Sequence, residues 1–198
     1  MLRYSMWLAG GSLMLGSVAT EVIGREQPAQ IQNYNAPGNL ESNYNLGCIG
    51  LNDVKPEYNP VDLFKAMKVC ILAKRYDDAV RLFAIAGTYG RYDSLRVADA
   101  TSHQAITVAR MEIFGDLPEA TSKEYDQAAS TFLSNSTKIA EICVEAKRIG
   151  PPTYFPRYMI QHGMGAFFRG NGDGLVQKFD SKTAWNQALA SYLKCAAS

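Results

Sequence analysis

The chain has 198 residues, of which 47% are hydrophobic and 20% are charged; this suits one folded domain with a hydrophobic core and excludes a chain that is disordered throughout. Its 20 Lys and Arg residues nearly balance its 19 Asp and Glu residues, and no dense basic cluster occurs. Such a neutral chain lacks the surface that attracts nucleic acids or anionic membranes, so both are excluded as partners.

The first residues have the pattern of a secretory signal peptide. Arg3 gives a positive start, and Met6 to Ala19 form an apolar run without a charge. The small residues Ser17 and Ala19 stand where signal peptidase needs them. Because the run is shorter than the roughly 18 apolar residues that span a membrane, we predict a signal peptide at residues 1–19. The mature protein is then periplasmic or secreted, without stable membrane insertion; a retained N-terminal anchor is the alternative.

Residues 20–59 are rich in Asn, Gly and Pro and show neither helical nor strand periodicity. We predict an irregular N-terminal arm here. Residues 20 to about 45 are expected to form a flexible tether, whereas Cys48 would attach the later part to the body. Residues 60–198 are predicted to form the helical domain.

Apolar residues at spacings of three and four predict two helices after Pro60. The first carries the apolar face Leu63, Ala66, Met67, Cys70 and Ala73. The second starts at Asp77 and Asp78 and is predicted to end at the glycines of GTYGRY. Together they form an antiparallel pair.

The remaining elements are also helical. Asp93 or Ser94 is predicted to cap a helix that ends near Gly115 and buries Leu95, Ala98, Ala105, Val108, Ala109 and Met111. Pro118 begins a stretch that runs to Ile149, with a break at residues 134–136. Pro156 begins a helix whose apolar edge is Met159, Ile160, Gly163 and Phe167. Asp180 caps the last helix, with its apolar stripe at Trp185, Ala188, Leu189, Tyr192 and Cys195.

No alternating apolar run is long enough for a sheet, so the predicted fold is all-α, a compact helical bundle.

Four cysteines suit an oxidising compartment, where an even number favours disulfides. Three pairings are possible, and we favour Cys48 with Cys70 and Cys143 with Cys195. A zinc site that uses His103 and His162 is the weaker alternative, because closely paired ligands are missing; we predict no metal and no cofactor.

One segment, KRYDDAVRLFAIAG, resembles the second helix of a tetratricopeptide repeat (TPR), with Tyr76, Ala79, Phe83 and Ala86 at the characteristic positions. The resemblance covers residues 61–90, and no second copy follows at a spacing of about 34 residues. It implies one TPR-like helix pair used for packing or for protein recognition. Ordinary helix pairing is the alternative interpretation.

The segments YGRYDSLRVADATSHQAIT and RIGPPTYFPRYMIQHGMGAFF resemble small exported helical proteins of Gram-negative bacteria. This resemblance covers most of residues 60–195 and carries no catalytic residues. Some proteins of this kind are immunity proteins, which bind and block a toxin delivered into the periplasm.

Few residues suggest catalysis, and we assign none as catalytic. Asp99 and His103 are four residues apart on a predicted helix, so the carboxylate can orient the imidazole as a general base. His162 shares a helix face with Tyr158. RGNGDG has Asn171 and Asp173 at calcium-ligand spacing, but Lys182 stands where an EF-hand loop needs Glu, so we interpret it as a turn.

Arg and Tyr residues gather near two turns and are typical of interface anchors. The candidate binding residues are Arg91, Tyr92, Arg96, Tyr154, Arg157 and Tyr158. The sequence therefore favours a periplasmic protein-binding module whose partner is a toxin or an envelope protein. The alternatives are a TPR-like envelope assembly scaffold and an envelope hydrolase that uses Asp99 and His103 or His162.

Overall fold

The computed structural model describes residues 36–167 and 172–196, which all belong to one unit of the chain, Tyr34–Ser198. The predicted all-α fold is confirmed: seven α-helices form within these ranges, no β-strand does, and one isolated bridge joins Val97 to Leu175. The predicted signal peptide and residues 20–35 of the predicted arm lie outside the described residues. Among the helices that are described, none combines the length and the hydropathy needed to cross a membrane.

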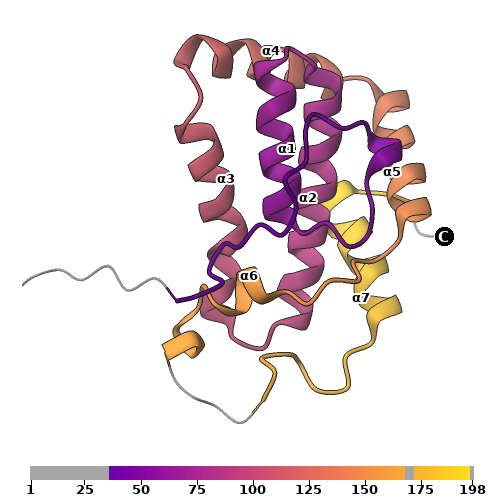
Figure 1. Ribbon diagram of the computed structural model, residues 1–198. Helices are drawn as coiled ribbons and strands as arrows, with labels where there is room; N and C mark the ends of the chain where they lie inside the picture. Colours follow the sequence, from indigo (N-terminus) through magenta and orange to yellow (C-terminus); the bar gives the residue numbers. More distant parts are fainter. Residues whose placement is uncertain (1–35, 168–171, 197–198) are drawn as a thin grey trace, which may run out of the picture. The chain divides into compact units, whose positions relative to one another are not determined.

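Helices α1 (Pro60–Leu72) and α2 (Tyr76–Arg96) stand side by side at the centre of the fold (Figure 1). The Asn59 side chain caps α1 by accepting the backbone N–H groups of Val61 and Asp62. The Asp62 carboxylate completes the capping box by accepting the Asn59 N–H. This pair is the predicted helix hairpin.

The predicted end of the second helix at the glycines is wrong, because α2 continues through them to Arg96. Gly87 and Gly90 serve close packing instead. A Cβ at Gly87 would overlap the Tyr192 ring, and a Cβ at Gly90 would overlap the Ile106 side chain. Each glycine therefore lets another segment pack directly against the α2 backbone.

Because α2 is longer than predicted, the next helix starts later. Asp93 and Ser94 lie in the last turns of α2 and cap no helix; Asp99 caps a 3₁₀ turn, Ala100–Gln104, which leads into α3 (Ala105–Gly115). Helix α3 ends at Gly115, as predicted. Ala105 and Ala109 are buried as expected, but Met111 is exposed.

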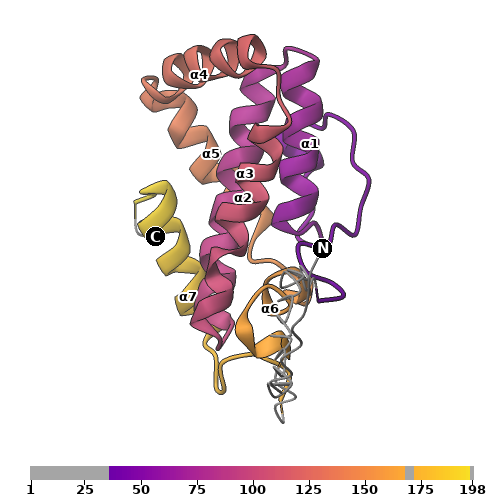
Figure 2. The same cartoon turned by 90° about the vertical axis from the view of Figure 1, so that its left-hand side faces the viewer.

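Helices α4 (Glu119–Leu133) and α5 (Ser136–Ile149) are separated at the predicted break, and the Asn135 side chain caps α5. Figure 1 shows α3 on one side of the central pair and α5 and α7 on the other. Helix α4 crosses one end of the pair, and both views place α6 at the opposite end (Figure 2).

The segment from Pro156 to Phe167 is less regular than predicted. Helix α6 is a single turn, Arg157–Ile160, and a 3₁₀ turn comes next at Met164–Phe167, where Phe167 is exposed. Helix α7 (Ser181–Ala188) is capped by Asp180, as expected, and continues into a π-helical turn, Leu189–Leu193. Trp185, Ala188, Leu189 and Cys195 are buried along the predicted stripe, whereas Tyr192 is partly exposed.

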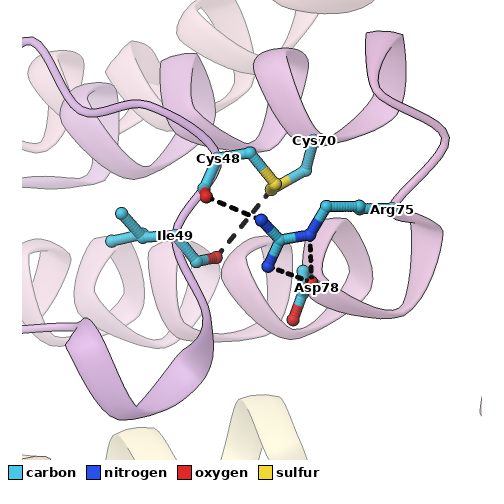
Figure 3. The surroundings of a disulfide bond; sticks show 5 residues. All are labelled: Cys48, Ile49, Cys70, Arg75 and Asp78. Carbon is cyan, nitrogen blue, oxygen red and sulfur yellow. Dashed lines mark hydrogen bonds and ion pairs between the residues drawn. A yellow bond between two sulfur atoms is a disulfide. The ribbon is translucent and has the colours of Figure 1, made fainter.

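Both favoured disulfide pairings are present. Cys48–Cys70 joins the arm to α1 (Figure 3). Beside it, Arg75 donates to the Cys48 carbonyl oxygen at 3.0 Å and pairs with Asp78. Cys143–Cys195 joins α5 to the C-terminal segment, so each disulfide ties an irregular part of the chain to a helix.

The prediction of a flexible tether is wrong for residues 36–45, which are bound to the helices. One oxygen of the buried Asp62 carboxylate accepts hydrogen bonds from the Ser42 hydroxyl and from the backbone N–H groups of Asn43 and Tyr44, at 2.6–2.9 Å. The Leu40 N–H donates to the carbonyl oxygen of Tyr158. The same Asp62 therefore both caps α1 and fixes the arm.

Candidate functional site

Four of the six candidate binding residues meet inside the protein, around the carboxylate of Asp93. One carboxylate oxygen accepts the Arg96 Nε–H at 2.7 Å, and the other accepts the hydroxyls of Tyr154 and Tyr158 at 2.8 and 2.7 Å. The Arg96 guanidinium also lies 5.1 Å from the ring centres of Tyr92 and Tyr154. This Asp93 cluster joins the end of α2 to α6 and to the segment before it.

Burial controls the electrostatics of the Asp93 cluster. It raises the pKa of the Asp93 carboxyl, while the Arg96 charge and the two phenol donors act in the opposite direction. Burial also raises the pKa values of Tyr154 and Tyr158 well above the ordinary value, so both phenols remain hydrogen-bond donors at neutral pH. Because Asp93 is completely buried, the cluster stabilises the fold and offers little surface to a partner.

The six candidate binding residues therefore do not form one group in the folded protein. Arg91 and Arg157 lie apart from the Asp93 cluster. Arg91 donates to the Ser191 hydroxyl at 3.3 Å, next to the C-terminal segment. Arg157 is exposed, packs over Gly38 of the arm and lies 3.5 Å from Glu41. The sequence placed the six residues in two clusters but gave no sign that an acid, Asp93, would draw four of them inside.

The proposed Asp99–His103 pair does not form. The Asp99 carboxylate accepts hydrogen bonds from the N–H and hydroxyl of Thr101 and from the N–H of Gly165. These hydrogen bonds lower the pKa of the Asp99 carboxyl, and the one from the Thr101 hydroxyl has the largest effect. His103 Nε2 lies 3.0 Å from the Val97 carbonyl oxygen. Asp99 therefore organises a turn instead of orienting the imidazole.

His162 belongs to the contact between the arm and α6. Its Nδ1 lies 2.8 Å from the Asn39 side-chain oxygen, and burial lowers its pKa. Asp99, His103 and His162, the residues of the hydrolase alternative, therefore have separate hydrogen-bond partners. Within the described residues, no two of them are hydrogen-bonded to each other or share a partner.

Within residues 36–167 and 172–196, no three His, Cys, Asp or Glu side chains gather as a metal site. Asn171 lies outside these ranges, and Asp173 accepts the Leu175 N–H at 3.0 Å, as in an ordinary Asx turn.

A groove of about 610 Å³ lies at the α6 end of the bundle. It runs between the start of the 3₁₀ turn at Asp99, the segment around α6 and the loop at residues 172–177. Phe155 lines this α6 groove, and Met164 and Val176 are chain neighbours of its lining residues Gly165 and Leu175. All three apolar side chains are exposed, Phe155 by 51% and Met164 by 57%.

Hydrogen bonds hold the backbone of the exposed Met164 in place. The Met164 N–H donates to the Thr101 hydroxyl at 2.9 Å, and the next N–H, of Gly165, donates to Asp99 at 2.7 Å. Gly163 is also close to this network, since a Cβ there would overlap the Asp99 carboxylate. The turn at Asp99 therefore fixes the backbone at this edge of the α6 groove.

A second cavity, of about 580 Å³, lies between α2, α3, α4, α5 and the C-terminal segment. Its wall is mainly apolar and includes Val80, Phe83, Phe114, Ala129, Leu133, Ile139, Ile142 and Leu193. Its polar groups include Arg110 of α3, Asp126 of α4 and the Tyr192 hydroxyl. We call it the α2–α5 pocket.

The α2–α5 pocket was not predicted from the sequence, although two signals bear on it. Tyr192 lies on the predicted apolar stripe of the last helix but is partly exposed in the folded protein. Gly87, assigned to a helix end, is the small residue over which the Tyr192 ring lies. The π-helical turn that carries Tyr192 is a rare element that is frequent at functional sites.

Comparison of this chain with known protein families, with characterised proteins and with solved structures finds no match to any of them.

Proposed function

We propose that this protein is an exported, periplasmic binding protein that recognises a protein partner through the α6 groove. The single observation that carries the proposal is a group of exposed apolar side chains: Phe155, which lines the groove, and Met164 and Val176, which are chain neighbours of lining residues. Exposed apolar groups that border a hollow mark interaction sites, and aromatic residues and methionine are enriched in interfaces.

The construction of the groove supports the same role. Its edge is made of loops and short turns, which carry binding residues in many folds, and it rests on the buried Asp93 cluster and the Asp99 turn. A surface that is already ordered before binding loses less conformational entropy when a partner docks. We propose a delivered toxin as the partner, so that the protein acts as an immunity protein.

The partner prediction is tested by substituting the exposed apolar side chains. Phe155→Ser with Met164→Ser should leave the fold intact, because exposed substitutions usually change stability by about 0.5 kcal/mol or less. Affinity for the partner should fall by roughly thirtyfold, because a central apolar anchor contributes about 2 kcal/mol. The measurement is capture from periplasmic extract by the immobilised protein, followed by titration of the captured partner.

The matched control is Leu72→Ser, since Leu72 is 54% exposed but is the last residue of α1 and does not line the α6 groove. If the double variant and the control variant both keep the partner, the partner does not use the α6 groove, and the proposal is wrong. If the partner captured by the unsubstituted protein is an envelope assembly protein and not a toxin, the result supports the scaffold alternative.

The export part of the proposal rests on two disulfides and on the uncharged apolar run from Met6 to Ala19. We expect protein isolated from the periplasm to begin at Thr20. N-terminal sequencing is the measurement, and an N-terminus at Met1 or Leu2 in that fraction would contradict cleavage.

A further inference from the structure

The α2–α5 pocket is distinct from the α6 groove and has the character of a small-molecule site. Its volume of about 580 Å³ lies within the usual range of ligand pockets, roughly 300–1,000 Å³, and its wall is mostly apolar with a few polar groups. The pocket is set between helices that are held by the Cys143–Cys195 disulfide on one side and by the central helix pair on the other. Its shape is therefore largely formed without a ligand.

Three polar groups of the α2–α5 pocket have no hydrogen-bond or ion-pair partner among the described residues: Arg110, Asp126 and the Tyr192 hydroxyl. Arg110 and Asp126 are exposed, so they stand at the rim and not in the apolar interior. Other surface charges of α4 are paired, as in Lys123 with Glu119 and Glu124 with Lys74.

The cation and the phenol belong to the same part of the pocket. The Arg110 charge acts on the Tyr192 phenol, and both Asp126 and Tyr192 act on Tyr125. Burial raises the pKa of the Tyr192 phenol, so the hydroxyl keeps its proton and remains a donor. The Tyr192 hydroxyl and the ring carbon that carries it lie against Gly87 of α2, where a side chain would overlap them. The polar groups of the pocket thus include two hydrogen-bond donors, the Arg110 guanidinium and the Tyr192 hydroxyl, and a single carboxylate, that of Asp126.

We propose that the α2–α5 pocket binds a single-chain amphiphile with a carboxylate head, such as a medium-chain fatty acid. The aliphatic chain lies against the apolar wall formed by Phe83, Phe114 and Ile142, and the carboxylate accepts hydrogen bonds from Arg110 and Tyr192. Arg presents parallel N–H groups that match the two oxygens of a carboxylate. This inference goes beyond the proposed function and does not depend on it, because it uses a different surface.

The direct test is calorimetric titration of the whole mature protein with decanoate, decanol and decyltrimethylammonium, each below its critical micelle concentration. Decanoate should bind at least tenfold more tightly than the cationic amphiphile. Octanoate should bind roughly fifteenfold more weakly than decanoate, because it has two fewer methylenes and each buried methylene changes affinity by about fourfold. A head group preference for the cation, or an affinity that does not change with chain length, would overturn the proposal.

Arg110→Ala separates recognition of the head group from burial of the chain. It should weaken decanoate binding by about tenfold and leave decanol binding unchanged, because only the carboxylate loses its charged donor. Asp126→Asn is the matched control at the same rim and should not weaken decanoate binding. Ala129→Phe, which fills the pocket from α4, should weaken both ligands, provided that its circular dichroism matches that of the unsubstituted protein. If Arg110→Ala leaves decanoate affinity unchanged, or if decanoate gives no saturable binding, the proposed site is wrong.

Discussion

Replacing Asp93 by Ala is expected to lower the free energy of unfolding by about 3–5 kcal/mol, because it leaves a buried arginine without its counter-ion. In the folded protein Asp93 is completely buried and satisfies Arg96, Tyr154 and Tyr158 together. The Arg96 Nη2 atom already lacks a hydrogen-bond partner among the described residues, so without Asp93 the guanidinium would lose its ion pair as well. Urea unfolding of the variant, followed by circular dichroism, measures the loss.

The control for Asp93→Ala is Asp116→Ala. Asp116 also forms an ion pair, with Lys68 at 3.0 Å, but its side chain is 69% exposed, so its removal should cost less than about 1 kcal/mol. The double variant Asp93→Leu with Arg96→Met should lose less stability than Asp93→Ala, because it removes both buried charges. Equal unfolding midpoints for Asp93→Ala and the unsubstituted protein would contradict the structural role of the cluster.

Removing the Cys143–Cys195 disulfide is the second change with a large expected effect. In the double variant Cys143→Ala with Cys195→Ala, stability should fall by about 4 kcal/mol, since the bond closes a loop with a sequence separation of 52 in the unfolded chain. The loss should be concentrated at the C-terminus, where the disulfide ties the segment after α7 to α5. Urea unfolding and hydrogen exchange of residues 181–195 measure the total and the local effect.

The matched control is the other disulfide. Cys48→Ala with Cys70→Ala should also lower stability, by about 3 kcal/mol for a sequence separation of 22, but it should leave hydrogen exchange in α7 close to that of the unsubstituted protein. If instead both double variants accelerate exchange in α7 equally, the C-terminal segment is not held by Cys143–Cys195, and the structural interpretation fails.

Local sequence signals predicted most helix boundaries. Pro60, Asn135, Gly150 and Asp180 mark helix ends in the structure, because proline and capping side chains act on the backbone of their own segment. The prediction failed at Gly87 and Gly90, which do not end α2. Their packing partners, Tyr192 and Ile106, come from other elements of the fold, and a local pattern contains no information about them.

The candidate sites also depend on contacts between distant parts of the chain, which the sequence pattern does not reveal. Sequence reasoning identified Arg96, Tyr154 and Tyr158 as a set with a shared role, but their common partner Asp93 and their burial depend on how α2 meets α6 and the segment before it. Arg110 and Tyr192 are 82 positions apart and were not connected by any motif. Both proposed binding sites are made of side chains that only folding brings near one another.

The amino-acid sequence by itself determined the helical class, the disulfide pairing that we favoured, and most helix ends, since these depend on periodicity, cysteine positions and capping chemistry within short segments. Tertiary structure alone decided that residues 42–44 are bound through Asp62, that Arg96, Tyr154 and Tyr158 gather around the buried Asp93, and that an apolar pocket lies beside Tyr192. The physical reason is that burial and the pairing of charges depend on contacts between residues far apart in the chain, whereas helix formation depends mainly on neighbours three and four positions away.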